Sequence, residues 1–125
     1  MPVTIKWYDK EKTILFYTIT NDWGLEEAWE ILESKTLPMS REIGSVPDTI
    51  MDFTRSKTVP TGLMDFWRQS YSWLQKHHLE SSMVVFVQSS PIMQGIGNTL
   101  RTLRVPIMKN MFFANSVEEA YQRIT

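Results

Sequence analysis

Hydroxyl side chains that could take part in chemistry gather in the stretch DFTRSKTVPTGLMDFW, at residues 52–67. The stretch leaves a short apolar run, passes through four hydroxyls, a proline and a glycine, and then begins an apolar stripe at helical spacing. A loop of this composition between a strand and a helix can hold a bound phosphate, a catalytic serine, a regulatory phosphorylation site or only a helix cap. Taken alone, the stretch does not choose among these four.

The chain offers few other groups for catalysis or metal binding. It has no cysteine, which excludes disulfides, thiolate nucleophiles and thiolate metal sites. Its two histidines, His77 and His78, are adjacent, so on a helix they point about 100° apart and do not form the one-face pair of an H-E-x-x-H motif. No serine lies in a G-x-S-x-G motif. We therefore expect no metal, no cofactor, no catalytic residue and no enzyme activity.

Two further patterns have ordinary structural interpretations. Gly95 and Gly97 supply the first half of a G-x-G-x-x-G nucleotide motif, but Leu100 stands where the third glycine should be. We interpret the two glycines as small residues of a helix where another element packs closely. The glutamates within residues 26–33 fit the solvated outer face of a helix better than a carboxylate pair held in a cleft.

Length and composition are those of one globular domain, residues 1–125. Hydrophobic residues make up 42% of the chain and charged residues 22%, and 13 basic side chains are balanced by 14 acidic ones. This balance lacks the clustered positive charge of a nucleic-acid-binding protein. No apolar run approaches the roughly 20 residues that span a bilayer, and the N-terminus lacks the pattern of a signal peptide. We expect a cytoplasmic protein that binds neither nucleic acid nor membranes.

The first elements are predicted to be two paired strands. Apolar residues alternate over residues 3–7, as in a strand with one buried face. ILFYTI, at residues 14–19, is apolar on both faces, as in a strand covered on two sides. Because only a short charged turn separates them, the two runs form an antiparallel hairpin. If its first strand is an exposed sheet edge, a homodimer could form by strand pairing.

The next elements are predicted as helix, loop and strand. An apolar stripe over residues 25–32 has helical spacing, and Asp22 is placed to cap its first turn. Residues 36–47 contain two prolines and a glycine, which predicts a loop. TIMDF, at residues 49–53, then reads as a short strand.

The second half alternates helices and strands. Apolar residues at helical spacing predict a helix over residues 63–78, and MVVFV at residues 83–87 is the most clearly buried strand. Ser90 is predicted to cap the next helix, and MFFA at residues 111–114 is the last strand. A capping box that starts at Ser116 begins the final helix. The apolar stripes of the last two helices are Met93, Ile96, Leu100 and Leu103, and then Val117, Ala120, Tyr121 and Ile124.

The predicted element order is ββαβαβαβα. Alternating strands and helices are typical of an α/β fold with parallel strands and right-handed crossovers. The initial hairpin adds one antiparallel pair. We therefore predict a mixed, mostly parallel sheet of about five strands with four helices.

This element order and the hydroxyl-rich loop resemble the STAS family, the fold of anti-sigma-factor antagonists, and look closest to its divergent SpoIIAA-like branch of small bacterial proteins. That branch often pairs a tryptophan at the first helix with a helix-starting proline after the third strand, as Trp23 and Pro60 do here. The family's regulatory motif runs D-L-S, a short spacer, then I-D-S-S-G-L. Residues 52–54 match its first half, and residues 59–63 match its second half with one residue missing.

The resemblance implies a non-enzymatic regulatory domain that binds a protein partner and is switched by phosphorylation near the second helix. By this match Thr61 stands at the phospho-acceptor position, and Thr58 is the second candidate. A phosphoryl group there would lie at a helix N-terminus, which favours an anion. The chain departs from the motif because Pro60 replaces an acid and threonine replaces serine. Helix capping by Thr58 and Thr61 is the plainer interpretation.

Residues at the predicted partner surface come from this loop and the outer face of the next helix. Trp73 falls off the apolar stripe of that helix, and Met64 leans away from it; interfaces are enriched in both residue types. A wide buried face would explain them equally well. The surface candidates for a partner or a ligand are Asp52, Thr54, Ser56, Met64, Trp73, Ser89 and Ser90.

The alternative function is binding of a small apolar molecule. In open, mostly parallel sheets, ligands bind beyond the carboxyl ends of the strands, where the hydroxyls of the loop and of Ser89 and Ser90 converge. This hypothesis places an apolar pocket at that edge, lined by Met64, Trp67 and Met93, with the hydroxyls at its mouth.

Overall fold

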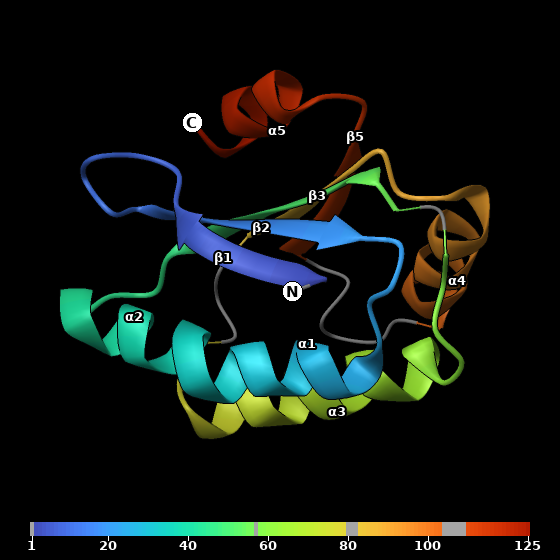
Figure 1. Cartoon of the computed structure of the whole chain (residues 1–125), viewed down its shortest axis with the longest axis horizontal. Helices are drawn as coiled ribbons and strands as arrows, with labels where there is room; N and C mark the ends of the chain where they lie inside the picture. Colours follow the sequence, from blue (N-terminus) through green and yellow to red (C-terminus); the bar gives the residue numbers. More distant parts are fainter. Residues whose placement is uncertain (1, 57, 80–82, 104–109) are drawn as a thin grey trace.

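The computed structural model describes residues 2–56, 58–79, 83–103 and 110–125, except the side chain of Leu100, and it contains one five-stranded sheet (Figure 1). The strands lie in the order in which the chain makes them: β1 (Val3–Trp7), β2 (Ile14–Thr20), β3 (Asp48–Arg55), β4 (Val84–Val87) and β5 (Met111–Ala114). β1 runs antiparallel to β2, and the other neighbours are parallel. The predicted mixed, mostly parallel sheet is confirmed.

Helices cover both faces of the sheet. The helical segments are α1 (Leu25–Ile31), the π-helical turn η1 (Leu32–Thr36), α2 (Leu37–Ile43), α3 (Leu63–Lys76), α4 (Pro91–Thr102) and α5 (Val117–Ile124). On one face lie α3, α4 and the first helix, which is the run of α1, η1 and α2, while α5 covers the other face (Figure 1). Because α1, η1 and α2 are continuous, the described chain has the four predicted helical bodies.

The strand β4 shows why helices pack on both faces of the sheet. Val85, Phe86 and Val87 are all almost fully buried, as the unbroken apolar run predicted. Phe86 belongs to the core cluster under α3 and α4, whereas Val85 and Val87 belong to the cluster under α5. Because successive side chains of β4 point to opposite faces of the sheet, this one strand contributes to both hydrophobic clusters.

The loop predicted for residues 36–47 is wrong for most of its length, because the first helix continues to Ile43. The π-helical turn makes this possible: the Leu37 amide donates to the Leu32 carbonyl, five residues back. Pro38, whose ring would clash with a carbonyl one turn earlier in a regular α-helix, follows directly after this wider turn. The helix ends at Gly44, which is left-handed at φ 67°.

Predicted helix starts and stripes had mixed outcomes. Ser90 and Ser116 cap their helices as expected, each accepting a hydrogen bond from the amide three residues later. Asp22 does not cap α1; the N-cap is Gly24, which makes no side-chain bond. Leu103 is 60% exposed, so it does not continue the stripe of α4, and the predicted role of the Leu100 side chain lies outside the described residues.

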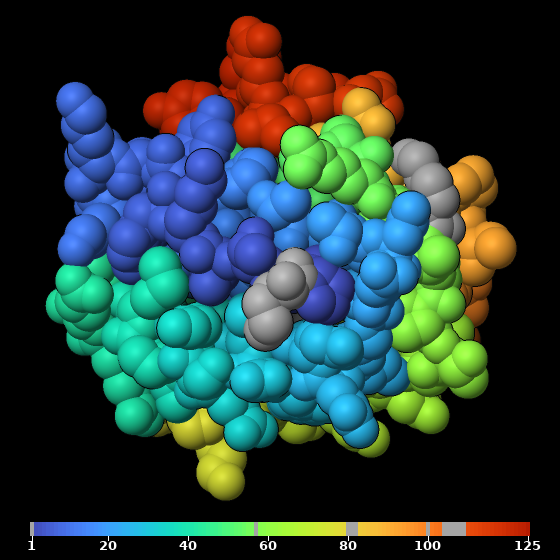
Figure 2. Space-filling view, viewed as in Figure 1, coloured from blue at the N-terminus to red at the C-terminus, as the bar shows by residue number. Residues whose placement is uncertain are grey.

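Two surface features bear on the earlier expectations. β1 pairs only with β2 among the described strands, and it lies at the front of the molecule between α5 and the first helix (Figure 2). Of the helices described, none combines the length and hydropathy needed to cross a bilayer.

The two glycines of α4 provide a matched test of close packing. A Cβ at Gly97 would come 2.7 Å from Cζ of Phe113, whereas a Cβ at Gly95 would meet nothing within 4 Å. Gly95→Ala should raise the free energy of unfolding by up to about 1 kcal/mol, because alanine favours helix. Gly97→Ala should leave the protein about 1–3 kcal/mol less stable than Gly95→Ala, because the ring must move. Urea denaturation measures both; equal stabilities would contradict the packing role of Gly97.

Candidate functional site

The loop between β3 and α3 is fastened to the connection between β2 and α1. Oγ1 of Thr58 donates to the carbonyl of Asn21 at 2.8 Å, and the indole Nε1 of Trp23 donates to the carbonyl of Thr58 at 3.2 Å. The two segments lie side by side on the surface, one light blue and the other green (Figure 2). The loop is therefore held by contacts to residues more than thirty positions away in the sequence.

The start of α3 is set by a glycine. Gly62 is the N-cap, with a left-handed backbone at φ 85°, and α3 has no side-chain cap. The capping interpretation of Thr58 and Thr61 is therefore wrong: the hydroxyl of Thr58 is used on Asn21, and Thr61 is exposed one residue before the cap. Within the described part of the chain, the hydroxyl of Thr58 is hydrogen-bonded and that of the exposed Thr61 is not.

Hydroxyls beyond the strand ends separate into exposed and buried groups. Thr54 is exposed and donates through both its amide and Oγ1 to Oδ1 of Asp52, at 2.9 and 2.7 Å. Ser56 and Ser89 are 1% and 6% exposed, and neither hydroxyl has a hydrogen-bond partner among the described residues. Oγ of Ser90 is buried and accepts from the amide of Met93. The sequence predicted one hydroxyl-lined edge, but the fold does not gather these side chains on one open surface.

Met64 and Trp73 are both half-buried. Met64 packs against the core cluster, and the ring of Trp73 lies 4.6 Å from that of His77, centroid to centroid. The most exposed large apolar side chains among the described residues lie elsewhere: Tyr8, Ile92, Leu103 and Tyr121. The wide buried face accounts for Met64 better than an outward patch does.

No described group of three histidines or carboxylates could hold a metal ion.

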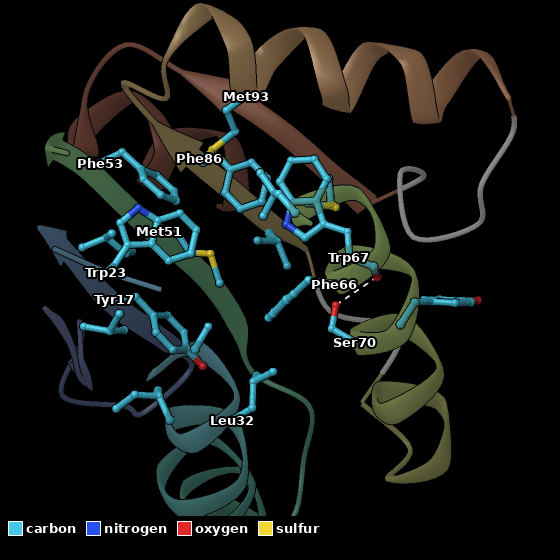
Figure 3. Close-up of a pocket in the computed structure, with 18 of the residues that line it drawn as sticks. Tyr17, Trp23, Leu32, Met51, Phe53, Phe66, Trp67, Ser70, Phe86 and Met93 are labelled. Atoms are coloured by element: carbon cyan, nitrogen blue, oxygen red, sulfur yellow. Dashed lines mark hydrogen bonds between the residues drawn. The ribbon is translucent and has the colours of Figure 1, made fainter. Parts of the chain in front are cut away.

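An apolar cavity of about 130 Å³ lies between the sheet and the helices α1 and α3 (Figure 3). Trp67 stacks on Phe86 with centroids 5.5 Å apart, and Phe53 meets Phe86 edge-on at 5.8 Å. Met93 and Trp67 line the cavity as the pocket hypothesis expected, but Met64 does not. The cavity is also inside the core and not at the hydroxyl edge, because the aromatic side chains hold the helices away from the sheet.

A second cavity of about 60 Å³ adjoins the first. The walls common to both are Tyr17, Leu32, Met51, Leu74 and Val84. The second is also lined by three hydroxyl residues of the first helix and β3 that do not line the first, which are Thr36, Ser40 and Thr49. The sequence pointed to none of these three, although the spacing of Thr36 and Ser40 would place them on one face of a helix.

The hydroxyl of Tyr17 forms a buried hydrogen bond with that of Thr36. Burial raises the pKa of the Tyr17 phenol, and its hydrogen bond to Thr36 lowers the pKa by less. The net shift of the Tyr17 pKa is therefore upward, so the folded state keeps the phenol protonated. At neutral pH Tyr17 is an uncharged donor or acceptor in this part of the core.

The sheet order, the four helical bodies and the fastened loop define a STAS/SpoIIAA-like α/β fold. No family model matches the chain, and no curated protein matches it. Among solved structures, the chain is similar to SpoIIAA, described as a Bacillus cell fate determinant and solved in the phosphorylated form. The two share 12% sequence identity with a TM-score of 0.62, and the match covers 98% of this chain and 99% of SpoIIAA. The fold predicted from the sequence is confirmed.

Thr58 and Thr61 differ in a way that stability can test. Thr58→Val should lower the free energy of unfolding by about 1 kcal/mol, because the hydrogen bond from Thr58 to the Asn21 carbonyl is lost. Thr61→Val should change it by less than about 0.5 kcal/mol, since an exposed hydroxyl without a protein partner contributes little. Chemical denaturation of both variants gives the comparison, and a loss at Thr61 as large as that at Thr58 would restore the helix-cap interpretation.

Proposed function

We propose that the chain is a non-enzymatic, cytoplasmic regulatory domain that binds a protein partner through the loop of residues 54–61 and the outer face of α3. The observation that carries this proposal is the exposed hydroxyl of Thr61, next to the start of α3, in a loop fixed by Thr58 and Trp23. A fixed loop can be recognised without first paying the entropy of ordering it.

Phosphorylation of Thr61 is the proposed switch. A phosphoryl group would add about 1.5–2 negative charges beside the free amides at the N-terminus of α3. The likeness to SpoIIAA, which was solved in the phosphorylated form, supports the same kind of control. Asp65 in the first turn of α3 would oppose this attraction, and the added charge would change the surface that the partner meets.

An enzymatic role has little support in the described residues. The buried hydroxyls of Ser56 and Ser89 have no partner that could act as a base. His77 lies beyond the C-terminal end of α3 and packs on Trp73, at the opposite end of that helix from Thr61. Nucleophilic catalysis needs the hydroxyl and the base within hydrogen-bond reach.

The phosphorylation proposal predicts the modification state of the native protein. The protein purified from its native host should carry an added phosphate that peptide mapping assigns to Thr61. Thr61→Val should remove it, and Thr58→Val should keep it, because of these two threonines only Thr58 has its hydroxyl hydrogen-bonded to another described residue, the carbonyl of Asn21. A protein partner bound by the unmodified form should bind the phosphorylated form at least about tenfold more weakly in calorimetry. A phosphate on Thr58, or equal affinity of the two forms, would contradict the proposal.

A second candidate function is binding of a small, mainly apolar molecule in the core cavity. The cavity of about 130 Å³, walled by Trp67, Phe86 and Met93, supports it. Protein interiors are normally packed almost without voids, and a dry apolar cavity near this size binds benzene-sized molecules. Trp23 and Trp67 line the cavity, so occupancy should change the intrinsic fluorescence of the protein.

Filling the cavity tests this second function. Native mass spectrometry of the protein from its host should show a non-covalent mass that disappears on denaturation. Ala28→Leu adds carbon atoms at the wall of the cavity and should abolish that mass, while raising the free energy of unfolding by about 0.5–2 kcal/mol. Glu30→Leu, at an exposed position of the same helix, is the matched control and should keep the ligand. Retention of the mass by Ala28→Leu would place any ligand elsewhere.

A further inference from the structure

One end of the mainly apolar core between the sheet and the first helix contains a group of buried hydroxyls. Oγ of Ser40 is 2% exposed and has no hydrogen-bond partner among the described residues. It lines the smaller cavity together with Thr36 and Tyr17, whose hydroxyls bond to each other. An unpaired buried hydroxyl costs roughly 1–3 kcal/mol, so its presence beside a cavity calls for a partner that enters the cavity.

The first helix aims these hydroxyls at the cavity. Thr36 ends the π-helical turn and Ser40 follows four residues later on α2, so both face the sheet and both are buried. Single π-helical turns occur frequently at functional sites, because they change which side chains a helix turns inward. The turn that admits Pro38 therefore also sets the positions of the two hydroxyls.

Charge and size limit what the cavities can take. None of the described residues that line either cavity is charged, so a carboxylate or an ammonium group would be buried without a counter-charge. The larger cavity, of about 130 Å³, fits one ring or a short chain. The smaller one, of about 60 Å³, adds room for a polar substituent and a short linker.

We propose that the two cavities together hold one small neutral amphipathic molecule, an apolar ring or chain that carries a hydroxyl or carbonyl oxygen. That oxygen hydrogen-bonds to Oγ of Ser40 beside the Tyr17–Thr36 pair. The apolar part extends between the residues that line both cavities and lies in the larger one. This inference rests on the second candidate function, the binding of an apolar molecule. It adds the orientation of the ligand and the group that recognises it.

Two probes of nearly equal shape test the orientation. 4-Ethylphenol and 4-ethyltoluene differ by a hydroxyl in place of a methyl group, and 4-ethyltoluene is the more hydrophobic. Isothermal titration calorimetry with the full chain should show 4-ethylphenol binding about tenfold more tightly, because only the phenol can pair with Ser40. Tighter binding of 4-ethyltoluene or equal binding of the two would overturn the inference.

Two serine variants separate recognition from general damage to the cavity. Ser40→Ala should weaken 4-ethylphenol binding by about five- to tenfold and leave 4-ethyltoluene unchanged. It should fold at least as stably as the parent, because it removes an unpaired buried hydroxyl. Ser70→Ala is the control: Ser70 lines the larger cavity, but its Oγ already donates to the carbonyl of Trp67 at 3.0 Å (Figure 3). It should not change the preference for the phenol.

The outcomes distinguish the inference from the function on which it rests. If both probes bind and Ser40→Ala has no effect on either, the cavity binds ligands but Ser40 does not recognise them, and the inference is overturned alone. If neither probe binds to the parent protein, both the second candidate function and this inference fail.

Discussion

The stacked rings of Trp67 and Phe86 set the distance between α3 and the sheet, and much of the molecule depends on that distance. Their centroids are 5.5 Å apart and the ring planes are within 9° of parallel. Phe53 and Phe113 meet Phe86 from neighbouring strands, so the ring is held from several sides. The cavity lies beside this stack, and Ser70, Tyr71 and Leu74, farther along α3, line it.

The loop and the cavity are not independent, because they share a side chain. Trp23 contributes to both, since its indole N–H holds the carbonyl of Thr58 while its ring lines the cavity and meets Phe53 edge-on at 5.9 Å. A substitution at Trp23 would change both features at once. Residues such as Thr61 and Ser40 belong to one feature each, and for that reason they separate a surface switch from a buried binding site.

Much of the fold followed from the sequence because its signals are local. Alternating or unbroken apolar runs predicted all five described strands, and the stripe over residues 63–78 predicted α3 within two residues of its observed end. Ser90 and Ser116 could be recognised as caps because a cap and its bonded amide are three residues apart. The hydroxyl-rich loop was also located correctly, since proline and glycine mark where a helix cannot extend backwards.

By itself, the sequence determined the element order, the buried faces of the strands and most of those of the helices, and the place of the loop, because these depend on residues within a turn or two of one another. Only the tertiary structure decided what the side chains do there. Thr58 bonds to Asn21 and not to its own helix, and Gly62 takes the cap position. The first helix continues past Pro38 because its apolar side chains pack under the sheet and a wider turn absorbs the proline. The cavity and the unpaired hydroxyl of Ser40 likewise arise where distant elements meet, and the fit between such elements leaves no periodic trace along the chain.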